Sequence, residues 1–195
     1  MIDQLHVILP AVFGLTSVLY LWLAVRVSRA SSESSNSMIS YFLFLIGLMV
    51  AGSAFSYKAT DLNIYGIGRT LSFFSAGFLP VVFYMIYRQF TTGKVHPFLL
   101  LLLSIIPVVT AGLSMTNELH GLMWTVVETG GELHSSSANE HIWFNRVFAP
   151  FAYGLFGFSI IALTGRLPSI ALAHRRKVLL LILCAVLPYS ISLSN

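Results

Sequence analysis

Six long stretches without a single Asp, Glu, Lys or Arg run through this chain of 195 residues. Each is expected to cross a membrane, because about 20 helical residues span roughly 30 Å of hydrocarbon. The stretches are apolar around their whole circumference and several are rich in leucine, which favours helices over the alternating strands of a membrane β-barrel. The expected spans are residues 6–25, 38–57, 70–87, 97–115, 147–163 and 178–195.

The composition agrees with a chain surrounded by lipid. Only 9% of the residues are charged, whereas a soluble domain averages about 25%. The net charge of +4 comes from scarce acidic residues rather than from a basic face, so nucleic acid is not an expected partner. The fold class is therefore an all-α, polytopic transmembrane helix bundle that forms one domain over residues 1–195, with the lipid bilayer as its first partner.

The distribution of basic residues predicts the orientation. Eight of the eleven lie in the loops after the first, third and fifth spans, which are expected to face the cytoplasm. The N-terminus and the long loop 116–146 are then extracytoplasmic. Within that loop, Gly130-Gly131 between short strand-like runs predicts a hairpin. The eight are Arg26, Arg29, Arg88, Lys94, Arg166, Arg175, Arg176 and Lys177.

The spans lack the chemistry of several membrane functions. They contain no ionisable carboxylate, lysine or arginine, which excludes a proton relay at the midplane and an intramembrane protease site. The loop histidines His120, His134 and His141 show no tight metal-ligand spacing. No catalytic residue, cofactor or metal is therefore expected in these residues.

A polar stripe at the outer end of the third span is a candidate binding site. Arg69 precedes the span, and Ser72 and Ser75 follow it at steps of three residues, which places them on one helical face. Arg146 begins the fifth span at the same height, with Tyr153 two turns deeper. The guanidinium groups suit an anionic or carboxylate group. Alternatively, the arginines reach lipid headgroups or nearby acids, and the serines bond to their own helix.

One segment carries a resemblance to a known family. Pro107 lies in an apolar helix that runs into Thr116-Asn117, His120 and Trp124. This pattern resembles the end of helix four in the N-terminal seven-helix sensor domain of bacterial histidine kinases and diguanylate cyclases. The run Gly77–Phe83 looks like that family's third helix, and Trp143-Phe144 before the fifth span also fits. The layout of spans and loops is similar over essentially the whole chain.

The resemblance implies a sensory input module in a bacterial inner membrane that passes an extracytoplasmic signal to a cytoplasmic kinase or cyclase. The signal would be a small organic ligand, and the parent protein would be a homodimer. Since the family has seven spans and six are visible here, the chain is expected to be a fragment that lacks helix seven and the output domain. Any enzymatic activity would reside in that output.

The same hypothesis assigns roles to individual residues. Arg69 and Arg146 would fix a polar or anionic head of the ligand, and an apolar body would pack on aromatic side chains, namely Tyr65, Trp124 and Tyr153. Asn117 and His120 would instead be structural, capping the fourth helix and tying down the loop. Two other classes stay open: a small transporter or transporter half built from three-helix repeats, and a structural membrane subunit.

Overall fold

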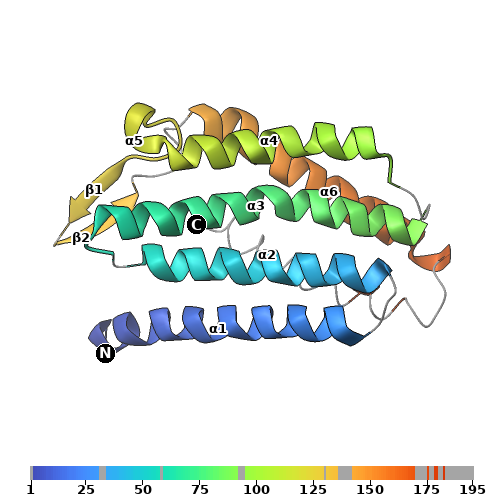
Figure 1. Ribbon diagram of the computed structural model, residues 1–195, viewed down its shortest axis with the longest axis horizontal. Coiled ribbons are helices and arrows are strands. Elements are labelled where there is room, and N and C mark those ends of the chain that lie inside the picture. The colour runs from blue at the N-terminus through green and yellow to red at the C-terminus, as the bar shows by residue number, and fades with distance from the viewer. Residues whose placement is uncertain are drawn as a thin grey trace.

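The computed structural model describes residues 2–30, 34–57, 59–91, 95–129, 131–135 and 142–169, together with residues 175, 178, 179 and 182. Long helices lie side by side along the longest axis of the molecule (Figure 1). They are α1 (Ile2–Ala30), α2 (Ser34–Ser56), α3 (Leu62–Thr91), α4 (Pro97–Met115) and α6 (Ala149–Arg166). The smaller elements are α5 (Asn117–His120), strands β1 (Val126–Thr129) and β2 (Glu132–Ser135), a π-helix η2 (Phe144–Phe148) and a 3₁₀ turn η3 (Leu167–Ser169).

Five helices of the described residues are long and apolar enough to cross a membrane. The expected all-α transmembrane bundle is confirmed. The helix α3 begins at Leu62 rather than near residue 70, so Arg69 lies two turns inside it instead of at its start. The span expected at 178–195 lies almost wholly outside the described residues. Of that span, Val178 is fully buried in the core.

The helix α3 is the centre of the bundle, because it packs against α2, α4 and α6, whereas α1 packs mainly on α2. One core cluster lies along its second half, where Phe83 contacts Phe42 of α2 and Phe156 of α6. A second cluster surrounds Phe73 in its first half, near the hairpin end of the bundle. Of the candidate binding residues, Tyr65 and Trp124 belong to this second cluster.

The helices α2 and α3 approach closely where two glycines face each other. A Cβ atom at Gly68 would lie 2.6 Å from the carbonyl oxygen of Gly52, and one at Gly52 would lie 2.5 Å from that of Gly68. The hydroxyl of Ser72 crosses the same contact and donates to the Met49 carbonyl at 3.3 Å. Small side chains thus let the two backbones touch, as is common between membrane helices.

The expected hairpin in the long loop is present. Strands β1 and β2 pair antiparallel, with Val126 opposite Ser135 and Thr129 opposite Glu132. Gly131 in the turn has a φ of 80°, a left-handed conformation that glycine adopts without steric cost. The hairpin and α5 together lie over one end of the bundle, as Figure 1 shows.

Candidate functional site

The segment that follows α4 is organised by the side chain of Asn117. Its amide nitrogen donates to the Trp124 carbonyl at 2.7 Å, and its amide oxygen accepts from the backbone N–H groups of Met123 at 2.9 Å and Trp124 at 3.3 Å. All three residues are buried. One side chain therefore closes the loop by satisfying backbone groups that would otherwise be buried without partners.

His120 completes the loop on its exposed side. The backbone N–H of Leu122 donates to its Nδ1 atom at 2.9 Å, so the neutral ring carries its proton on Nε2. That Nε2 lies 3.1 Å from the hydroxyl of Thr116, which in turn donates to the Gly112 carbonyl at the end of α4. The side chains of Asn117 and His120 thus hold this loop together through hydrogen bonds.

The indole of Trp124 is held in place on one face of an aromatic cluster. Its ring stacks on Phe73 at a centroid distance of 5.4 Å and an interplanar angle of 2°. Phe73 also meets Phe144 and Phe148 of η2 edge to face. Trp143, just before η2, donates its indole N–H to the hydroxyl of Thr110 on α4 at 3.0 Å. Such contacts fix both the position and the tilt of Trp124.

Arg69 joins this cluster as a cation on aromatic faces. Its guanidinium carbon lies 5.1 Å from the ring centroid of Phe73 and 5.7 Å from that of Trp124. Its Nε atom is buried and has no hydrogen-bond partner among the described residues. The aromatic quadrupoles provide favourable electrostatic contacts for the cation at this depth in the bundle.

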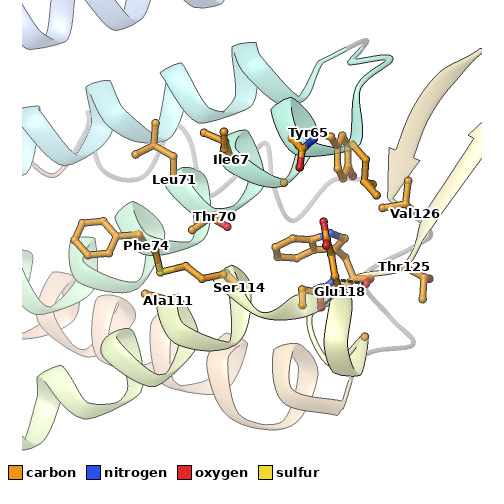
Figure 2. A pocket seen from close by; sticks show the side chains of 17 residues that line it. Tyr65, Ile67, Thr70, Leu71, Phe74, Ala111, Ser114, Glu118, Thr125 and Val126 are labelled. Carbon is orange, nitrogen blue, oxygen red and sulfur yellow. Dashed lines mark hydrogen bonds between the residues drawn. The ribbon is translucent and has the colours of Figure 1, made fainter.

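A cavity of about 1030 Å³ opens between α3, α4, α5 and the start of β1, and we call it the α3–α4 cavity. Its walls are mainly apolar and aromatic, with a few polar groups (Figure 2). The apolar and aromatic lining includes Leu62, Tyr65, Ile67, Leu71, Phe74, Ala111, Met115, Trp124 and Val126. The polar lining includes Asn63, Thr70, Ser114, Asn117, Glu118 and Thr125.

The structure brings only some of the sequence-predicted residues to this cavity. Tyr65, Trp124 and Asn117 line it. Arg69 does not line it but contacts Trp124, which does. The remaining predicted residues, which are Ser72, Ser75, Arg146, Tyr153 and His120, are not part of its lining.

Both serines of the expected polar stripe bond to backbone carbonyls. Ser72 donates to Met49 of α2, and the fully buried Ser75 donates to Leu71 of its own helix at 2.8 Å. Arg146 is exposed on η2, and Tyr153 is half-buried on α6. The stripe therefore contributes to helix packing at this end of the bundle.

Sequence reasoning missed several residues of the cavity, above all Ser114, Glu118 and Phe74. Ser114 and Phe74 lie inside apolar spans, where nothing in the pattern distinguishes them from core or lipid-facing residues. Within the described ranges, no group of three or more His, Cys, Asp or Glu residues could hold a metal ion.

Comparisons with known proteins agree with the helical architecture. No curated protein and no solved structure matches the chain significantly. The sequence pattern of one family, described as the N-terminal 7TM region of histidine kinase, matches residues 7–195. This match covers nearly the whole chain and favours the sensor hypothesis over a transporter or a structural subunit. The chain is therefore a membrane-embedded sensor domain that belongs to the N-terminal seven-transmembrane family of histidine kinases.

Proposed function

We propose that this sensor domain receives a small organic ligand in the α3–α4 cavity and passes the signal to a cytoplasmic kinase output. The observation that carries the proposal is the cavity itself. Its volume of about 1030 Å³ is close to the upper end of ordinary ligand sites, about 300–1,000 Å³, which are likewise mostly apolar with a few polar groups. Tyr65 and Trp124 offer rigid aromatic surface for an apolar ligand body.

The walls of the cavity suit a role in coupling. Most of the lining residues belong to two long helices, α3 and α4, and α3 also packs against α2 and α6. A ligand that binds one spacing of α3 and α4 more tightly than another shifts the population toward that spacing. The shift would then reach the kinase through the helices that follow, in a homodimer of the parent protein.

The proposed orientation places the cavity on the extracytoplasmic side of the bacterial inner membrane. The basic residues Arg26, Arg29, Arg88 and Arg166 lie near the ends of α1, α3 and α6 that face away from the hairpin (Figure 1). By the positive-inside tendency that end faces the cytoplasm. The hairpin, α5 and the N-terminus then lie outside.

Cysteine labelling tests this orientation in a background in which Cys184 is replaced by alanine. Leu119→Cys, on the exposed surface of α5, should react in intact cells with a thiol reagent that cannot cross the membrane. His96→Cys, in the connection between α3 and α4, should react only after the membrane is permeabilised. The reverse pattern would refute the orientation.

A cavity-filling substitution tests the signalling role. Ala111→Trp places an indole in the α3–α4 cavity and should act as a permanent ligand. In a kinase that carries this domain, we expect autophosphorylation in membrane vesicles to change by about fivefold or more, the lower end of allosteric couplings. Ile67→Trp fills the same cavity from the exposed side of α3 and provides a second test in case Ala111→Trp misfolds.

The matched control for this experiment is Val108→Trp. Val108 lies one turn before Ala111 on the exposed surface of α4 and does not line the cavity. Its substitution should leave autophosphorylation unchanged. If both cavity variants behave like this control while remaining folded, the cavity is not the site of signal reception.

A further inference from the structure

The hydroxyl of Ser114 departs from a pattern that other helical hydroxyls in this chain follow. Ser53, Ser56, Ser75, Ser159 and Thr91 each donate to the carbonyl four residues earlier, at distances between 2.7 and 3.0 Å. This is the usual solution for a hydroxyl in an apolar helix. The buried Oγ of Ser114 has no hydrogen-bond partner among the described residues, although Ser114 is only 3% exposed.

Because Ser114 lines the α3–α4 cavity, a molecule in that cavity is the natural partner for its hydroxyl. Buried polar groups without a partner are rare in native proteins, and each one calls for an explanation such as a bound water, a bound ion or a functional role. Figure 2 shows Ser114 on the α4 wall of the cavity, facing the α3 wall that carries Thr70. The ligand is therefore expected to carry a polar group that reaches this wall.

The charge of that polar group follows from Glu118. Among the described residues that line the cavity, Glu118 is the charged one. An ionised carboxylate only accepts hydrogen bonds, and the Ser114 hydroxyl can accept one as well. A donor with positive charge satisfies both groups. The arginines that favoured an anionic ligand in the sequence, Arg69 and Arg146, do not line the cavity.

The rest of the lining suits an apolar body attached to such a cation. In Figure 2, Glu118, Thr125 and Val126 lie toward the hairpin, whereas Leu71 and Phe74 lie at the opposite end. The cavity thus has a polar, acidic end and an apolar end.

We infer that the α3–α4 cavity binds a primary ammonium group on an apolar body, with the ammonium donating to the Glu118 carboxylate and the Ser114 hydroxyl. This inference rests on the proposed function and specifies the chemical class of its ligand. The same chemistry has two sources: a free amphiphilic amine, or the ethanolamine headgroup of a membrane lipid.

Three matched probes test the inference: phenylethylammonium, phenylpropanoate and phenylpropanol. The domain is placed in nanodiscs of phosphatidylglycerol, a lipid without an ammonium group, and each probe is titrated at high salt while tryptophan fluorescence is followed. The ammonium probe should bind at least about tenfold more tightly than the other two, because charge-assisted hydrogen bonds are the stronger ones.

Substitutions then assign the contacts. Glu118→Gln keeps the size of an exposed side chain and should weaken ammonium binding about tenfold. Ser114→Ala should weaken it severalfold without lowering the thermal unfolding temperature, since the hydroxyl has no partner among the described residues. The matched control is Ser159→Ala, which removes a fully buried hydroxyl of α6 outside the cavity and should leave the affinity unchanged.

The lipid arm repeats the titration in nanodiscs that contain phosphatidylethanolamine. Loss of ammonium binding there would identify the headgroup as the ligand, and unchanged binding would identify a free amine. Tighter binding of phenylpropanoate, or equal affinity for the ammonium probe after Glu118→Gln, would overturn the ammonium assignment while leaving a ligand site in place. Absence of binding by all three probes would overturn the ammonium assignment as well. The proposed function would be refuted only if the folded Ala111→Trp and Ile67→Trp variants also left autophosphorylation unchanged.

Discussion

Gly68→Ala is expected to destabilise the bundle by about 3 kcal/mol, the upper range for overpacking a well-packed interior. The new Cβ atom would lie 2.5 Å from the Ser56 hydroxyl oxygen and 2.6 Å from the Gly52 carbonyl oxygen. One of these neighbours is backbone and cannot rotate away. The helices α2 and α3 must therefore separate, and they lose their long packed contact together with the close approach of Gly52 to Gly68.

Thermal unfolding in nanodiscs, followed by circular dichroism, measures this effect. The matched control is Gly66→Ala, two residues earlier in α3, where a Cβ atom meets nothing within 4 Å. That control should be as stable as the original or slightly more so, because alanine favours a helix by about 1 kcal/mol over glycine. Equal unfolding temperatures for the two variants would contradict the close packing of α2 on α3.

Asn117→Ala should release Trp124 from the wall of the α3–α4 cavity. The substitution removes the three hydrogen bonds that the Asn117 side chain makes and leaves buried backbone groups of Met123 and Trp124 without these partners. Each such group costs about 1–3 kcal/mol when buried. The loop is expected to open locally rather than accept this cost, and binding of phenylethylammonium should fall about tenfold or more as its aromatic wall is lost.

The chain has three tryptophans, so a single-tryptophan variant can report on this loop. Replacing Trp22 and Trp143 with phenylalanine leaves Trp124 as the fluorophore, and acrylamide quenching measures its exposure. His120→Ala is the matched control, because it also removes an acceptor for a loop N–H but on the exposed side, where water can replace it. Quenching that stays unchanged in Asn117→Ala would refute the role of this side chain.

The membrane bundle could be predicted because charge is excluded from hydrocarbon so strongly that the charge-free stretches mark the helices. The start of α3 at Leu62 could not be predicted in this way. Arg69 looks like a boundary residue, since an isolated cation in lipid is costly. In the structure its guanidinium rests on the rings of Phe73 and Trp124, and the second ring comes from a loop 55 residues away in sequence.

The candidate binding site could be predicted only in part, because a serine in an apolar helix has two very different uses. Ser75 and Ser114 both occur within apolar spans and both are buried. The first bonds to its own helix and the second faces a cavity. Which use applies depends on neighbours from other helices, and no local spacing reveals it. Of the three aromatic residues predicted to contact a ligand, Tyr65 and Trp124 line the cavity and Tyr153 does not.

The π-helix at Phe144–Phe148 gives the start of α6 an angular offset. A π turn holds one residue more than an α turn, and each helical residue turns by about 100°. Side chains before the turn therefore point about 100° away from the directions that a continuous α-helix would give them. This offset directs Trp143 to Thr110 of α4, while Phe156 beyond the turn packs on Phe83 of α3. An insertion or deletion between Trp143 and Ala149 would consequently disrupt these contacts, just as a substitution would.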